Sequence, residues 1–193
     1  MSRWAALAAL FLAAAASAEP NAIVLVAKPE LADPNFSGTV VLVTRTPTGD
    51  TVGVVLNRPT RLKLSDVAPE FPRASAYRER LYAGGPVLEA VIVALFRSPA
   101  PPAAPAFQVL DDVYLSMQPE SINSLLAQPA ARAFRLFAGF CGWAPGQLEA
   151  ELDRDSWYVL PATEDLLFRQ ETSGMWRELI DRLQSRRAIY FSE

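Results

Sequence analysis

Four carboxylates, Glu149, Glu151, Asp153 and Asp155, alternate along one short segment and are the side chains best suited to chemistry. Carboxylate oxygens bind magnesium or calcium, so the alternative function is a metal-assisted hydrolase. On a helix, however, side chains two residues apart point about 200° from each other, and the four cannot converge on one ion. Only Glu149 and Asp153 share a face. We therefore prefer a solvated helix surface, in which Glu151 bonds a backbone group of the adjacent loop, and expect no catalytic residue, metal or cofactor.

Histidine is absent from the chain, and Cys141 is the single cysteine. The missing imidazole excludes Ser-His-Asp and Cys-His pairs and nearly every ordinary zinc or copper site. One cysteine excludes thiolate clusters and an intramolecular disulfide. We expect Cys141 to be buried as a small apolar residue, with an intermolecular disulfide as the alternative.

Glycine-containing turns are the candidate binding sites. Their backbone N–H groups could approach a ligand, and a helix that opens at Pro145 would favour an anion there. We prefer a structural interpretation, in which the glycines serve positive φ angles and close packing. Trp143 is likewise expected to be a buried anchor rather than a stacking platform, and Asn57 to cap its own backbone before a proline. The residues that we select for ligand or partner binding are Asn57, Gly84, Gly85, Pro86, Gly142, Trp143, Gln147 and Glu151.

The N-terminus has the pattern of a secretory signal: Arg3, then an apolar run over residues 4–16, then small residues at 16 and 18. The run is too short for a comfortable membrane span, which needs about 20 residues. We predict a signal peptide over residues 1–18, cleavage between Ala18 and Glu19, and a periplasmic or secreted protein without a stable membrane anchor.

The predicted mature chain, residues 19–193, has a length that suits one domain. Without Arg3 it keeps 17 of the 18 basic residues against 21 acidic ones, a net charge of −4. Duplex DNA and anionic membranes both need clustered positive charge, so we expect no nucleic-acid partner. The expected partner is an unidentified protein or small ligand.

Short Val-rich runs separated by Gly and Pro turns predict a mostly antiparallel sheet, barrel-like and flanked by helices, in an α+β domain. Ser98–Ala106 contains four prolines and is expected to be an exposed loop, whereas residues 61–79 read as irregular with one short helix. A last helix is expected to follow Ser173 as its cap, with an apolar stripe that faces the core. The expected strands are 23–27, 39–46, 51–56, 80–82, 91–97, 107 onward, 133–140 and 157–160, and the other expected helices are 119–127 and 145–154.

Three blocks together resemble the YqgE/AlgH family. The first is Asp33–Phe36, followed by the Val-rich strand, a glycine turn and Gly53–Pro59. The second is the Gly84–Val87 turn, and the third is Gly139–Trp157. The resemblance spans roughly residues 22–168 and implies a compact α+β protein with a β-barrel core. Some members carry the label of transcriptional regulator, but no established catalytic mechanism comes with the resemblance. The chain departs from the family pattern at Arg45 and Phe96, where histidines are often found.

The preferred function is a non-enzymatic binding or regulatory module of the YqgE/AlgH type that works outside the cytoplasm. Transcriptional regulation by DNA contact is a further alternative, which only the family label suggests. The signal also departs from the family, because its members usually look cytosolic, and a cytoplasmic location is the alternative.

Overall fold

A computed structural model describes residues 22–128 and 133–190 of the chain, so the predicted signal and its cleavage site at Ala18 and Glu19 lie outside the described residues. The strands are β1 (Ala22–Ala27), β2 (Val40–Arg45), β3 (Thr51–Val55), β4 (Leu81–Ala83), β5 (Val87–Arg97), β6 (Phe107–Leu110), β7 (Val113–Ser116), β8 (Phe134–Trp143) and β9 (Trp157–Pro161). The helices are α1 (Leu64–Val67), the 3-10 turn η1 (Ala74–Ala76), α2 (Pro119–Ala127), α3 (Gln147–Asp153), α4 (Glu164–Leu167) and α5 (Met175–Tyr190).

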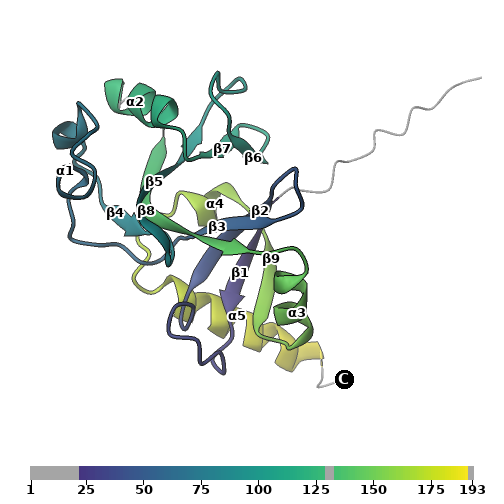
Figure 1. Ribbon diagram of the computed structural model, residues 1–193. Helices are drawn as coiled ribbons and strands as arrows, with labels where there is room; N and C mark the ends of the chain where they lie inside the picture. Colours follow the sequence, from purple (N-terminus) through teal and green to yellow (C-terminus); the bar gives the residue numbers. More distant parts are fainter. Residues whose placement is uncertain (1–21, 129–132, 191–193) are drawn as a thin grey trace, which may run out of the picture.

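The strands form one curled sheet in the order β6-β7-β5-β8-β3-β2-β1-β9, with β4 paired to β8 off this path (Figure 1). The β4–β8 pair is parallel and the other pairs are antiparallel. Long β8 joins the two halves, because its first part pairs with β5 and its last part with β3. The predicted class, an α+β fold with a mostly antiparallel, barrel-like core flanked by helices, is confirmed as a half-barrel.

Alternating side chains of β1, β2, β8 and the second half of β5 enter different cores, which requires apolar residues on both faces of these strands. In β1, Val24 and Val26 join the core inside the half-barrel, while Leu25 and Ala27 join a core on the outer side. The same alternation places Val93 of β5 inside and its neighbours in a third core against α1 and α2. The central part of the sheet is therefore covered on both sides.

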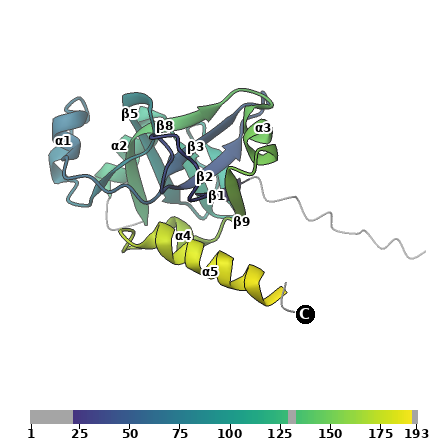
Figure 2. The same cartoon turned by 90° about the horizontal axis from the view of Figure 1, so that it is seen from below.

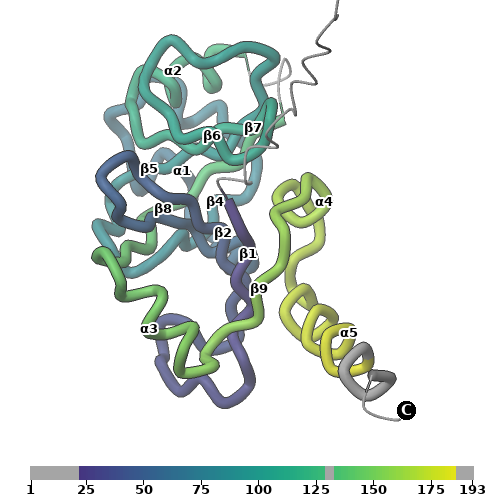
Figure 3. Tube along the Cα trace, turned by 90° about the vertical axis from the view of Figure 1, so that its right-hand side faces the viewer, coloured from purple at the N-terminus to yellow at the C-terminus, as the bar shows by residue number. Residues whose placement is uncertain are grey.

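Helix α5 covers the inner core. Met175, Leu179 and Ile180 are at most 5% exposed and pack in that core, and the Trp176 Nε1–H donates to the Ala27 carbonyl of β1 at 2.7 Å. Figures 2 and 3 show α4 and α5 together along one side of the sheet, beside β9 and β1. The expected core-facing stripe of the last helix is thus confirmed for Trp176, Leu179 and Ile180. Among the described residues, we find no helix with both the length and the apolar character to cross a bilayer.

Several boundaries differ from the sequence-based expectation. Strand β8 does not end at Phe140, because Gly142 and Trp143 continue the ladder opposite Val52 and Thr51. Helix α3 begins at Gln147 rather than at Pro145, since Gly146 takes a left-handed φ of 80° as the residue before the helix.

Further differences lie in β5 and near the C-terminus. Strand β5 begins four residues early, at Val87, and contains an irregularity at Leu88 (φ 46°). The region after Phe107 is a hairpin of β6 and β7, and α4 was not expected. Ser173 does not cap α5, which begins two residues later; its hydroxyl instead donates to the Glu171 carboxylate at 2.5 Å.

Candidate functional site

The Glu151 carboxylate of α3 joins two tryptophans. Its Oε2 accepts the indole N–H of Trp143 at 3.1 Å and that of Trp157 at 3.0 Å. The Phe36 ring lies 5.5 Å from each indole, stacked on Trp143 and edge-on to Trp157. Trp143 is 2% exposed, so the expectation of a buried anchor is confirmed. The expectation that Glu151 bonds a loop backbone group is wrong, because two buried indole donors need an acceptor.

The other acidic residues of this segment do not converge. Glu149 forms an ion pair with Arg45 of β2, Asp155 forms one with Lys28, and Asp153 is exposed. In the described part of the chain, no three His, Cys, Asp or Glu residues are grouped as metal ligands would be. The solvated-surface interpretation therefore holds for Glu149 and Asp153 and fails for Glu151.

Gly84 and Gly85 are placed by close backbone contact with β8. A Cβ on Gly84 would lie 2.2 Å from the Gly139 carbonyl oxygen, and one on Gly85 would lie 2.3 Å from the Phe140 carbonyl carbon and oxygen. Only glycine permits such an approach. The Gly84 carbonyl also accepts the Val55 N–H at 2.8 Å, which connects this turn to β3. Close packing thus accounts for both glycines, and Pro86 beside them is exposed.

Asn57 does not cap its own turn, contrary to expectation. Its side-chain oxygen accepts the Val40 N–H at 2.8 Å, and its amide donates to the Gly38 carbonyl at 2.9 Å. Both partners precede Asn57 by 17 or more residues, so the amide joins the end of β3 to the start of β2. Its hydrogen-bonding capacity is used within the fold.

Gly142 and Gln147 are both exposed and lie on either side of the turn between β8 and α3. A Cβ on Gly142 would meet nothing nearer than a Phe140 ring carbon at 3.7 Å, so packing does not require this glycine. The Gln147 side chain accepts the Ala144 N–H at 3.2 Å and donates to Glu151 at 3.4 Å. Because α3 has only seven residues and does not begin at Pro145, the expected anion site at its start has no long helix behind it.

The predicted residues therefore form two groups rather than one site. Asn57, Gly84 and Gly85 lie around the junction of β3 and β8, whereas Trp143, Gln147 and Glu151 surround the α3 turn. The two clefts described next contain none of these residues in their linings.

Cys141 lies between the two groups and is fully buried. Its thiol donates to the Gly84 carbonyl at 3.4 Å, and burial raises its pKa to about 12. The expectation of a buried, apolar cysteine is confirmed. A buried and protonated thiol is a poor nucleophile.

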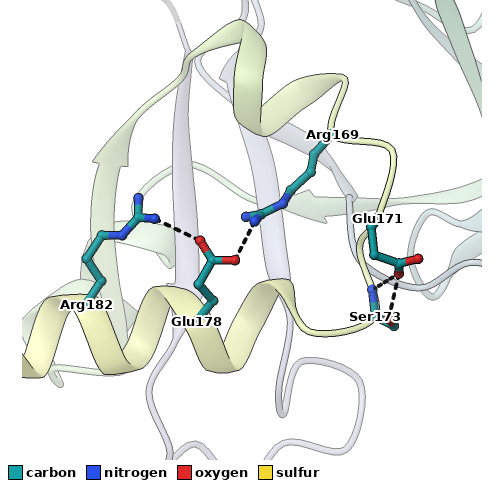
Figure 4. Close-up of polar contacts among 5 residues, drawn as sticks. All are labelled: Arg169, Glu171, Ser173, Glu178 and Arg182. Carbon is teal, nitrogen blue, oxygen red and sulfur yellow. Dashed lines mark hydrogen bonds and ion pairs between the residues drawn. The ribbon is translucent and has the colours of Figure 1, made fainter.

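Sequence reasoning missed a cleft of about 450 Å³ between β9, α4 and α5, which we call the α5 cleft. The Glu178 carboxylate on α5 forms an ion pair with Arg169 from the loop after α4. It also accepts a hydrogen bond from the Arg182 guanidinium, one helical turn further on, at 2.8 Å (Figure 4). Nearby in Figure 4, Ser173 donates to Glu171, and these hydrogen bonds lower the pKa of that exposed carboxyl. The lining is completed by Leu160, Pro161, Thr163, Asp165, Leu166, Leu179 and Leu183. One residue of the cleft could have been noticed in the sequence. Leu183 belongs to the apolar stripe predicted for the last helix, but it lines this cleft instead of packing in the core.

A second cleft, of about 680 Å³, opens where β4 and β8 meet the loop after α4. Arg135 of β8 lines it, and we call it the Arg135 cleft. The remaining lining is Ala76, Tyr77, Arg78, Glu79, Arg80, Tyr82, Ala133, Phe134, Phe168 and Gln170. No spacing in the sequence predicts it, because three segments far apart in the chain contribute.

Comparison with known proteins agrees with the fold. A UPF0301 protein of Thermobifida fusca is 37% identical over 166 residues, covering 82% of this chain and 84% of the relative. A UPF0301 protein of Mycobacterium avium is 32% identical, covering 89% and 87%. The solution structure of the AlgH protein from Pseudomonas aeruginosa matches with a TM-score of 0.69 at 28% identity, covering 84% of this chain and 88% of that one. A crystal structure of protein DIP2367 from Corynebacterium diphtheriae matches with a TM-score of 0.63 at 27% identity, covering 84% and 86%.

The profile of one family, described as AlgH-like, matches residues 24–188 and so extends from within β1 to most of α5. The resemblance seen in the three sequence blocks is confirmed: the chain belongs to the AlgH-like family.

Proposed function

We propose that this protein is a non-enzymatic binding module that works outside the cytoplasm and holds a small amphipathic ligand in the α5 cleft. The observation that carries the proposal is the composition of that cleft. Leucines from β9, α4 and α5 supply an apolar wall, and Arg169, Glu178 and Arg182 supply charge at one side. A volume of about 450 Å³ lies within the range of small-molecule sites, about 300–1,000 Å³.

The residue types that would otherwise do chemistry support binding rather than bond-making. Glu151 is held by two indoles, Glu149 is paired with Arg45, and the Cys141 thiol is buried with a raised pKa. Glu151 and Cys141 are thereby engaged in the core, which favours binding over bond-making, whereas Glu149 forms only an exposed surface ion pair. Turnover of phosphoester or peptide substrates that Glu149→Gln abolishes would favour the hydrolase instead.

Binding is tested with the fluorescent probe 1-anilinonaphthalene-8-sulfonate, which has an apolar body and one sulfonate. We expect saturable fluorescence enhancement by the folded protein. Leu183→Glu, which places a charge on the apolar wall, should abolish it, whereas Gln184→Glu, the exposed neighbour on α5, should leave it unchanged. Equal enhancement by both variants would contradict the α5 cleft as the site.

The location is supported by the signal-like pattern of the N-terminus and is tested separately. Cell fractionation followed by N-terminal sequencing should find mature protein that starts at Glu19 outside the cytoplasm. Unprocessed protein in the cytosol would overturn the location but not the binding role. A salt-sensitive shift of duplex DNA at micromolar protein would instead revive the DNA-binding alternative.

A further inference from the structure

Arg135 of β8 is a buried cation with incomplete hydrogen bonding. Its residue is 6% exposed, one guanidinium nitrogen donates to the Arg169 carbonyl at 2.5 Å, and the group lies 4.7 Å above the Tyr82 ring. The other terminal nitrogen, Nη1, is buried and has no hydrogen-bond partner. Burial lowers the pKa of this guanidinium, as expected for a cation removed from water.

A buried arginine normally has a carboxylate partner, because an unpaired buried charge costs several kcal/mol even after relaxation. The ion pairs formed within the described residues do not include Arg135. One carbonyl and one aromatic face offset part of the cost, but neither supplies a negative charge. The described part of the fold therefore provides no ion-pair partner for Arg135.

The surroundings of Arg135 favour an anion from outside. Arg78 and Arg80 are exposed at the rim of the Arg135 cleft and outnumber Glu79, so the lining carries three positive charges against one negative. This local excess contrasts with the net charge of −3 for the whole chain. The walls also present four aromatic rings, from Tyr77, Tyr82, Phe134 and Phe168.

We propose that the Arg135 cleft binds a small molecule that carries a carboxylate or phosphate group on an aromatic body. The oxoanion pairs with the Nη1 of Arg135 and with the rim arginines, since a planar guanidinium matches the geometry of such groups. The aromatic body packs against the ring-lined walls. Because Nη1 is covered, the guanidinium must turn toward the cleft when the anion enters. This site is separate from the α5 cleft and goes beyond the proposed function.

Phenyl phosphate is the test ligand, and phenol and inorganic phosphate are its two halves. In two-dimensional NMR of the ¹⁵N-labelled protein, phenyl phosphate should shift the amides of Phe134, Phe168 and Gln170 saturably, with tighter binding than either half alone. Absence of saturable shifts up to about 10 mM phenyl phosphate would overturn the proposal, because even a millimolar site would be filled.

Three variants locate the contact. Arg135→Lys keeps the charge but loses the planar donor pair, and should weaken phenyl phosphate binding about tenfold or more. Arg80→Gln changes an exposed rim residue, so it keeps the fold and should weaken binding several-fold. Arg154→Gln removes an exposed arginine outside the cleft and should have no effect. An equal loss in Arg80→Gln and Arg154→Gln would show diffuse charge attraction and overturn the site, even if Arg135→Lys failed to fold.

Discussion

The Glu151 carboxylate shows how a residue suited to catalysis serves the fold instead. It accepts hydrogen bonds from indoles on β8 and at the start of β9, and thereby connects α3 to two strands that are not neighbours in the sheet. Hydrogen bonds to a charged acceptor are among the stronger ones in proteins. Glu149 and Asp153 on the same helix make no comparable contact with the core.

Replacement of Glu151 by alanine should therefore destabilise the protein by about 1–3 kcal/mol, because both indole N–H groups lose their acceptor. Asp153→Ala on the same helix is the control and should stay within about 0.5 kcal/mol. Urea unfolding monitored by tryptophan fluorescence measures both. Equal midpoints for the two variants would contradict the structural role of Glu151.

Cys141 makes stability depend on pH at the alkaline end. Its folded pKa is raised to about 12 by burial, whereas the thiol of the unfolded chain has the ordinary value of 9.0. Between these values the unfolded state loses the proton and the folded state keeps it, so the free energy of unfolding falls as pH rises. Below pH 9 this contribution to stability is fully present.

The Cys141→Ala variant separates this effect from other alkaline titrations. We expect the wild type to lose more stability than Cys141→Ala as pH rises from 8 to 10.5, as measured by urea midpoints at each pH. Parallel pH profiles would show that the thiol titrates as freely in the folded protein as in the unfolded chain.

At the level of elements, β8 determines how the two halves of the sheet meet. Gly84 and Gly85 lie so close to its backbone that β4 and β5 can be joined by a very short turn. The turn that follows β8 is less constrained, since Gly142 has free space around it. Close packing thus explains the glycines of the turn between β4 and β5, but it does not explain Gly142.

Gly85→Ala and Gly142→Ala are a matched pair that tests this difference. The first places a methyl group 2.3 Å from the Phe140 backbone and should destabilise the protein by about 2 kcal/mol or more. The second meets nothing within 3.7 Å and should change stability by less than about 0.5 kcal/mol. Thermal unfolding compares them, and a stable Gly85→Ala protein would contradict the packing explanation.

Most elements could be predicted from the sequence because period-2 apolar runs and Gly or Pro turns are local signals. The β2–β3 hairpin and α2 are examples. Short α4 lacks a full turn of apolar periodicity, and the continuation of β8 through Gly142 depends on pairing with a strand about 90 residues earlier. The clefts were not predictable for the same reason: Arg135 lines a cleft only because β4, β8 and the loop after α4 meet in the folded chain.

Over the whole molecule, the sheet and α5 are separate layers that one polar contact helps to align. Trp176 inserts its ring beside the inner core and donates to the β1 carbonyl of Ala27 at 2.7 Å. This contact lies near the start of α5, and the α5 cleft lies further along the helix.

Trp176→Phe keeps an aromatic ring but loses this donor, and should cost about 0.5–1.5 kcal/mol. Because the contact holds α5, amide exchange should speed up in α5 more than in β2 and β3. Arg177→Gln, an exposed neighbour, is the control. A uniform change across all elements would show that α5 unfolds only with the sheet.

Arg169 connects the two clefts, because its side chain lines the α5 cleft and pairs with Glu178, while its carbonyl accepts a hydrogen bond from Arg135 of the other cleft. A phosphate that draws Arg135 away would free that carbonyl and loosen the loop that aims the Arg169 guanidinium at α5. Occupancy of one cleft should then alter affinity at the other, and thermodynamic linkage requires the same factor in both directions. Through Arg169, the protein would then respond to two ligands at once rather than carry one.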